Sequence, residues 1–410
     1  MDYNRSRLHY DRSKFLLGAY ILKPYARTEE HIKAMHEAGV DCLFFADPDR
    51  DMLDKLAKYG MGAYVWNIVP FWSGGRGENA GKLHETVTVE DYERIATEFA
   101  DHPAIWGIDI GDEPSALDFP HYKKLVEAAY RLFPNQFPFL NLYPNYAQVS
   151  KNTDDETISQ LGTPTYAEHL DKYFEYIDTD YLCYDYYMYS ASVHGAYENL
   201  CLAADRCRRF GRDLWIVLQV NSLFPEKWIS ENQLRHQAYT AMAFGVRAIS
   251  WACWTAGWWS NQVLDENGEK TQQYDKLYTV NHELRAMGDP YMAYRNRSTH
   301  FLGFAADSES MTDVPAPAEN GVTLGCFENV TADGGCALAG YMTAEDGREA
   351  LLLADAADPQ DNAPVEYTLR LACTKPLKAL KNGAPLELTC ENGVYAIPMG
   401  GSCGVLVMAE

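Results

Sequence analysis

The stretch IWGIDIGDEP (residues 105–114) reads as a short β-rich run that ends in two acidic residues and a proline. Seven further β-rich runs lie before and after it along the chain: FLLGAY (15–20), CLFFAD (42–47), GAYVWN (62–67), FPFLNLY (137–143), YLCYDYY (181–187), LWIVLQVN (214–221) and AISWACW (248–254). Short β-rich runs that alternate with helical patterns are typical of repeated βα units around a parallel sheet.

Helical patterns occupy the segments between these runs. In TEEHIKAMHEAG (28–39), Thr28 is suited to cap a helix and Gly39 to end it, and ENQLRHQAYTAMAFG (231–245) repeats apolar residues at helical spacing. Eight strand–helix repeats in about 280 residues predict a (β/α)₈ TIM barrel rather than an open doubly wound sheet. No GxGxxG or GxxxxGK[ST] loop follows an early strand, which argues against nucleotide-binding folds.

The composition changes near Arg295. All nine Trp lie between Trp66 and Trp259, and only three of the 28 Tyr follow residue 296. Beyond that point short alternating runs are separated by Gly, Asp, Asn and Pro, which predicts a small all-β sandwich. We therefore expect a barrel domain over residues 1–295 and a sandwich over 296–410. The second part shows no cluster of catalytic residue types, so we expect it to be structural or oligomer-forming.

Charge and composition exclude several classes of protein. The chain has 410 residues with 35 Lys+Arg against 58 Asp+Glu, a formal net charge of −23. Such a chain repels nucleic acid and anionic membranes, so we expect neither as a partner. The first residues lack the apolar core of a secretory signal, and no run approaches a membrane span, which predicts a cytoplasmic protein. The ten Cys form no CxxC pair and no HExxH motif occurs, so we expect neither metal nor cofactor.

The residues that end the β-rich runs are the candidates for a functional site, because catalysis in a barrel takes place at the C-terminal ends of the strands. Carboxylates and amides bind pairs of hydroxyl groups, while Tyr and Trp rings cover the apolar faces of a sugar. The combination predicts a carbohydrate as substrate. The candidates are Tyr20, Asp47, Trp66, Asn67, Asp112, Glu113, Asn141, Tyr143, Asp185, Tyr187, Gln219, Asn221, Trp251, Trp254 and Trp258.

The segment WGIDIGDEP (106–114) resembles the fourth-strand motif of retaining (β/α)₈ glycoside hydrolases, in which an Asn-Glu-Pro sequence carries the general acid/base. The resemblance implies that Glu113 is the acid/base and that Pro114 matches the proline, with Asp112 in place of the Asn. A barrel followed by a small sandwich also resembles bacterial β-galactosidase-like and related hydrolases in architecture. Fold alone does not establish function.

The seventh run departs from that motif. It ends with Gln219, where those enzymes carry a Glu nucleophile, and an amide cannot form the usual glycosyl ester. In one interpretation, Asp185 supplies the second carboxylate. In another, a 2-acetamido group of the substrate attacks the anomeric carbon. The adjacent Asp112 and Glu113 then resemble the Asp-Glu pair of β-hexosaminidases.

These observations predict a glycoside hydrolase in which Glu113 is the general acid/base, Asp185 is the second carboxylate, and an apolar surround raises the pKa of Glu113. Gln219, Asn141 and Asn67 are expected to hold sugar hydroxyls, and Trp254 and Trp258 to form a stacking platform. A barrel that binds carbohydrate without cleaving it is the alternative that Gln219 favours. A lyase or isomerase is disfavoured because no strand ends in Lys.

Overall fold

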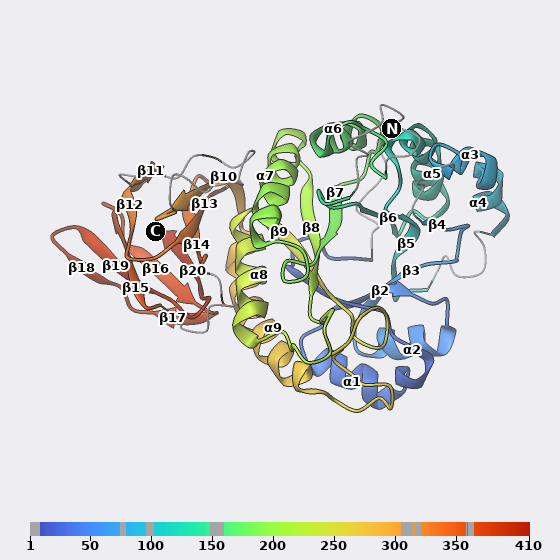
Figure 1. Ribbon diagram of the computed structural model, residues 1–410, viewed down its shortest axis with the longest axis horizontal. Coiled ribbons are helices and arrows are strands. Elements are labelled where there is room, and N and C mark those ends of the chain that lie inside the picture. The colour runs from blue at the N-terminus through green and yellow to red at the C-terminus, as the bar shows by residue number, and fades with distance from the viewer. Residues whose placement is uncertain are drawn as a thin grey trace.

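The computed structural model (Figure 1) describes residues 9–73, 79–95, 102–147, 160–304, 315, 318, 321–357, 359 and 365–410. It contains a parallel barrel followed by two antiparallel sheets, so the TIM barrel and β-sandwich predicted from the sequence are confirmed. Within these residues, no helix combines the length and the apolar character that crossing a bilayer requires.

Eight parallel strands form the barrel. They pair in chain order, and closure follows because β1 also pairs with β9 and β3 with β5. A two-residue strand, β4 (Trp72–Ser73), adds to β5 outside this ring. The barrel strands are β1 (Leu16–Tyr20), β2 (Cys42–Ala46), β3 (Gly62–Val65), β5 (Ile105–Asp112), β6 (Phe137–Leu142), β7 (Tyr181–Tyr186), β8 (Asp213–Gln219) and β9 (Val246–Ala252).

Helices cover the outside of the barrel (Figure 1). The Thr28 side chain accepts a hydrogen bond from the backbone N–H of His31 and Gly39 takes a left-handed φ of 77°, so both predicted boundaries of α1 are confirmed. The helices are α1 (Glu29–Glu37), α2 (Arg50–Lys58), α3 (Leu83–Thr86), α4 (Val89–Ile95), α5 (Phe119–Leu132), α6 (Tyr166–Tyr176), α7 (Val193–Phe210), α8 (Glu231–Ala243) and α9 (Gln272–Met292).

The C-terminal domain consists of two antiparallel sheets. One has the order β10-β13-β14-β20-β16-β17 and the other β11-β12-β15-β19-β18. The strands are β10 (Tyr294–Leu302), β11 (Val322–Leu324), β12 (Phe327–Asp333), β13 (Ala337–Ala344), β14 (Glu349–Asp355), β15 (Tyr367–Ala372), β16 (Leu377–Lys381), β17 (Ala384–Leu386), β18 (Thr389–Glu391), β19 (Val394–Met399) and β20 (Gly404–Ala409). Strand β10 follows α9 directly and crosses the boundary placed at residues 295 and 296.

The sandwich packs closely on α8 (Figure 1). A Cβ atom added to Gly340 of β13 would lie 2.2 Å from the carbonyl oxygen of Ala243, and one added to Gly404 would lie 2.2 Å from the Tyr239 ring. The Thr299 hydroxyl also donates to the Ala243 carbonyl at 2.9 Å. These close approaches require glycine at both positions.

Candidate active site

A cavity of about 240 Å³ opens at the C-terminal ends of the barrel strands. The residues that line it come from seven of the eight barrel strands or from the loops that follow them. Seven were candidates from the sequence, whereas Phe45 and Val217 were not. The lining residues are Tyr20, Phe45, Asp112, Glu113, Asn141, Asp185, Tyr187, Val217 and Trp258.

Asn141 joins two carboxylates at the floor of this cavity. Its side-chain nitrogen donates to Oδ1 of Asp112 at 3.1 Å and to Oδ1 of Asp185 at 2.8 Å. Since both oxygens contact one nitrogen atom, they lie no further apart than the sum of these distances, 5.9 Å. Strands β5, β6 and β7 are neighbours in the barrel, which is how residues so far apart in sequence meet.

Burial changes the protonation of this pair. Removal from water raises the pKa of Asp112 to about 6, against the hydrogen bond from Asn141 that lowers it. The same desolvation, together with the charge of Asp112, raises the pKa of Asp185 to about 7. Two interacting carboxyl groups titrate as a unit, so the pair retains a proton near neutral pH.

Asp109 lies deeper in the barrel, on β5 three residues before Asp112. Its side chain is buried and accepts a hydrogen bond from the backbone N–H of Gly111 at 3.3 Å. Burial and the nearby charge of Asp112 raise its pKa well above the usual range. Asp109 therefore lies beneath the cavity in surroundings that disfavour its charged form.

Glu113 follows β5 immediately and has an unusual backbone. Its φ is 48°, and its N–H donates to the Asn141 carbonyl at 2.8 Å. A left-handed conformation costs a residue with a side chain about 1 kcal/mol or more, and such strain concentrates at functional sites. The half-buried side chain of Glu113 lines the same cavity as Asp112 and Asp185.

Aromatic rings form the wall of the cavity. Tyr20 and Phe45 stack with centroids 5.6 Å apart, and Trp66 continues the stack behind Phe45 at 4.7 Å. Trp258 meets Tyr20 edge-on at 5.7 Å and lies 6.0 Å from Tyr187. A ligand in this cavity would contact ring faces and edges on one side and carboxylates on the other.

Tyr146 is a site residue that the sequence did not reveal. Its exposed ring packs edge-on against Tyr186 at 5.2 Å. Desolvation and the charges of Asp185 and Glu113 raise the pKa of Tyr146. Tyr146 lies in a loop after β6, so no strand-end rule could identify it. Phe45 was missed because it sits inside an apolar strand.

Three candidates from the second and third runs lie outside the cavity lining. Asp47 pairs with Arg27 and accepts a hydrogen bond from the indole N–H of Trp66 at 2.7 Å. Asn67 is exposed, with a φ of 58°. Asp47 therefore orients the Trp66 ring and does not line the cavity. Trp66 in turn packs behind Phe45, which does line it.

Gln219 does not present its amide to the cavity, contrary to the expectation that it holds a sugar hydroxyl. Its side-chain oxygen accepts from the Tyr189 N–H at 3.1 Å, and its nitrogen donates to Ser190 Oγ at 2.8 Å and to the Asn221 carbonyl at 3.0 Å. The buried Asn221 donates in turn to the Trp258 carbonyl at 2.6 Å. Both amides hold loops in place, and Asn221 fixes the loop that carries Trp258.

Trp254, Trp251 and Tyr143 are core residues. Trp254 is completely buried, so the expected stacking role is corrected for this residue and remains for Trp258. Trp251 is also fully buried and donates from its indole N–H to Oδ1 of Asn281 on α9 at 2.9 Å. Tyr143 is buried in the main hydrophobic core. In the part of the chain that the structure describes, no three His, Cys, Asp or Glu side chains gather as a metal site would require.

Comparison with known proteins relates the chain to glycoside hydrolases at the level of fold. Neither the protein-family models nor the curated proteins gave a match. Among solved structures, an alpha-amylase from Anoxybacillus is 10% identical with a TM-score of 0.52, covering 98% of this chain and 99% of that one. An identity this low shows a shared fold and does not transfer a mechanism.

Two further solved structures are similar over about two thirds of this chain. The beta-galactosidase of the Antarctic haloarchaeon Halorubrum lacusprofundi is 13% identical with a TM-score of 0.47, covering 66% of this chain and 58% of that one. The endo-1,4-beta-mannanase of Rhizomucor miehei is 10% identical with a TM-score of 0.45, covering 67% and 95%. This chain thus spans less than two thirds of the length of the haloarchaeal enzyme.

Proposed function

We propose that the chain is a glycoside hydrolase whose active site is the cavity around Asp112, Glu113 and Asp185. One observation carries the proposal: three carboxylates and the Asn141 amide face a wall of aromatic rings at the catalytic end of a (β/α)₈ barrel. Paired carboxyl groups are the catalytic machinery of most glycoside hydrolases, and rings beside them suit a sugar.

In this proposal Glu113 is the general acid/base and Asp185 is the second carboxylate. The second carboxylate has to be ionised to attack the anomeric carbon or to activate water. Because the pKa of Asp185 is about 7 and that of Asp112 is about 6, the proton that the pair retains lies mainly on Asp185, so Asp185 becomes the ionised second carboxylate as the pH rises above about 7. The Asn141 amide donates to both carboxylates and thereby favours the ionised form of each.

Variants of these carboxylates test the assignment. The full chain is assayed against a panel of nitrophenyl glycosides, and Glu113→Gln is expected to abolish turnover while leaving sugar binding intact. The variant Asp185→Gly is expected to lose turnover. Recovery of turnover on addition of azide would identify Asp185 as the nucleophile, because azide replaces the missing carboxylate. Full activity of Glu113→Gln would refute its role.

Substrate assistance is the second mechanism that the site allows. Asp112 and Glu113 are adjacent and line one cavity, and the seventh strand contributes no carboxylate to it. An enzyme of this kind would cleave only 2-acetamido sugars. Hydrolysis of nitrophenyl N-acetylglucosaminides with no hydrolysis of the matching glucosides would decide in its favour.

A carbohydrate-binding barrel without catalysis is the competing function. Gln219 occupies the end of the seventh strand and is held in a network of hydrogen bonds with Tyr189, Ser190 and Asn221. Oligosaccharide binding by calorimetry, together with no release of nitrophenol from any glycoside, would support this function over hydrolysis.

A further inference from the structure

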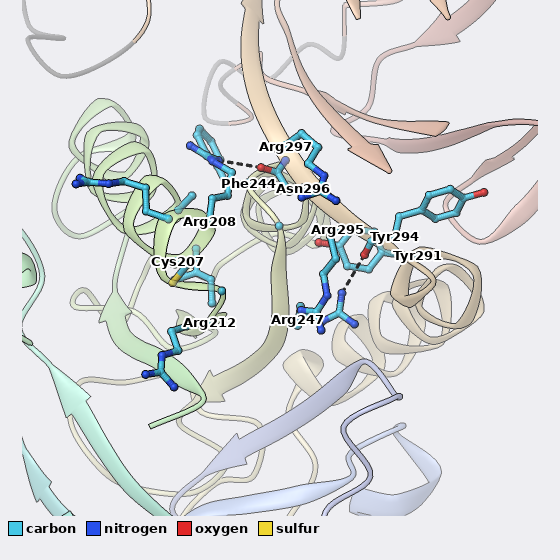
Figure 2. A pocket seen from close by; sticks show the side chains of 15 residues that line it. Cys207, Arg208, Arg212, Phe244, Arg247, Tyr291, Tyr294, Arg295, Asn296 and Arg297 are labelled. Carbon is cyan, nitrogen blue, oxygen red and sulfur yellow. Dashed lines mark hydrogen bonds between the residues drawn. The ribbon is translucent and has the colours of Figure 1, made fainter. Parts of the chain in front are cut away.

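A second and larger cavity, of about 510 Å³, lies at the N-terminal end of the barrel where the barrel meets β10. Six arginines line it and no carboxylate does: Arg208, Arg209, Arg212, Arg247, Arg295 and Arg297. Figure 2 shows Arg208 and Arg212 on the side of α7, and Arg247, Arg295 and Arg297 on the side of β9 and β10. This concentration of positive charge occurs in a chain whose net charge is −23.

Nearby aspartates neutralise only part of the charge. Arg12 joins the group because it pairs with Asp180 at 3.0 Å and with Asp213 at 3.3 Å. The ion pairs of the seven arginines involve four aspartates, namely Asp178, Asp180, Asp205 and Asp213. Seven positive and four negative groups leave a surplus of three positive charges around the cavity.

Some of these arginines have a structural role. Arg247 is buried and donates to the backbone carbonyls of Tyr294 at 3.0 Å and Met292 at 3.1 Å, which ties β9 to the start of β10. Arg295 pairs with Asp213. Packing and these bonds account for Arg247 and Arg295, so the surplus charge lies elsewhere.

Arg208 and Arg297 carry the surplus most clearly. Arg208 donates to Oδ1 of Asn296 at 2.8 Å, the bond drawn in Figure 2, and Arg297 donates to the Thr343 hydroxyl at 2.7 Å. In the residues that the structure describes, neither guanidinium group has a carboxylate within ion-pair distance. Burial lowers the pKa of Arg208, so this charge is held at a cost that an anion would relieve.

We propose that this cavity binds a small polyanion of the phosphate-ester class, with Arg208 and Arg297 supplying two guanidinium groups that form no ion pair among the described residues. The planar guanidinium fork binds phosphate oxygens in pairs, and a surplus of three charges matches a ligand with more than one negative charge. The volume is within the range of ordinary ligand sites and exceeds what one phosphate ion fills. Because the walls come from both the barrel and β10, the bound anion would also strengthen the junction between them.

Titration calorimetry of the full chain with inorganic pyrophosphate tests the proposal. We expect saturable binding with one ligand per chain that weakens as salt is raised. In the double variant Arg208→Ala/Arg297→Ala the affinity is expected to fall at least about tenfold, as two lost charge-assisted hydrogen bonds imply. Absence of saturable binding to the wild-type chain would overturn the proposal.

A matched control separates this site from general charge effects. The double variant Arg131→Ala/Arg370→Ala also removes two charges, from exposed arginines that pair with Glu93 and Asp333 elsewhere. If this control variant binds pyrophosphate within twofold of the wild-type affinity, the proposal is supported. If both double variants lose the same affinity, the proposal is contradicted. The single variant Arg297→Glu, at an exposed position, checks the result if Arg208→Ala disturbs folding.

The class of anion is tested with citrate in the same experiment. Tighter binding of citrate than of pyrophosphate would overturn the phosphate assignment in favour of a polycarboxylate. The result is independent of the proposed hydrolase, since Glu113→Gln is expected to bind pyrophosphate like the wild-type chain. Failure of pyrophosphate binding leaves the glycoside assay unaffected.

Discussion

The two ends of the barrel hold cavities of opposite charge. At the C-terminal ends of the strands, Asp112, Glu113 and Asp185 face a cavity of about 240 Å³ walled by aromatic rings. At the other end, six arginines line a cavity of about 510 Å³ beside β10. Strand β8 contributes to both, since Val217 lines the first cavity and Leu214 the second.

Under the two proposals, one scaffold has two separate binding sites. Burial raises the pKa of Asp112 and Asp185 and lowers that of Arg208 and Arg247, so each cavity disfavours its own charge. The acidic cavity is suited to stabilise a positively charged, oxocarbenium-like transition state. The basic cavity is suited to an anion, and substitutions at each end test whether the roles are separate.

The largest expected effect is on catalysis. Replacing Asp185 by Asn, or Glu113 by Gln, removes a carboxylate at the reaction centre and is expected to lower kcat about 10²–10⁴-fold. Measurement of kcat for a cleaved nitrophenyl glycoside checks this, with Arg131→Ala as the control because Arg131 is exposed and does not line the cavity. A loss below threefold in both variants would remove these residues from the mechanism.

Trp254 and Trp258, both in the β9–α9 loop, are expected to differ. Trp254→Ala empties a fully buried position and is expected to lower the free energy of unfolding by about 3–5 kcal/mol. Trp258→Ala removes a cavity wall, so KM should rise while most of the stability is kept. Denaturant unfolding and KM measured on both variants check the contrast. Equal losses of stability would contradict the separation of core from site.

The raised pKa values predict how stability depends on pH. An aspartate of ordinary pKa in the unfolded chain titrates near 4, whereas Asp185 titrates near 7 in the folded protein. The folded state therefore holds the proton more tightly, and its stability falls as pH rises from about 4 to about 7. Asp185→Asn removes this term and is expected to gain roughly 1–3 kcal/mol over wild type at pH 8, with no gain at pH 4. A pH-independent difference in melting temperature would contradict the shift.

The smallest expected effect concerns the end of the seventh strand. Gln219→Glu sets a carboxylate oxygen against the Asn221 carbonyl and is expected to cost about 1–3 kcal/mol in the free energy of unfolding, without raising kcat. Thermal unfolding and the glycoside assay check both parts. A gain in kcat would show that position 219 reaches the substrate after all.

Much of the fold could be predicted from the sequence. Each of the eight β-rich runs corresponds to a barrel strand. Short apolar segments that alternate with helical patterns are typical of the strands of a parallel sheet. Strands β10 and β16 were not anticipated. In β10, YRNRSTHFL shows little apolar alternation, and its packing on the barrel decides its structure.

Catalytic residues of a barrel lie at the C-terminal ends of its strands, and this rule predicted the cavity-lining residues correctly where the side chain at the strand end points inward. Asp112, Asn141 and Asp185 meet because their strands are neighbours in the barrel. The rule does not say which strand-end side chain turns away, and for this reason Gln219 and Trp254 were misplaced. The arginine cavity could not be found from sequence, since its residues come from α7, β9 and β10 and meet only in the folded chain.

The most direct test is the release of nitrophenol from a panel of α- and β-linked nitrophenyl glycosides by the wild-type chain and by Glu113→Gln. The account predicts that the wild-type chain cleaves at least one of them and that Glu113→Gln, folded as judged by its melting temperature, does not. No cleavage of any glycoside by the wild-type chain, or undiminished cleavage by Glu113→Gln, would contradict it.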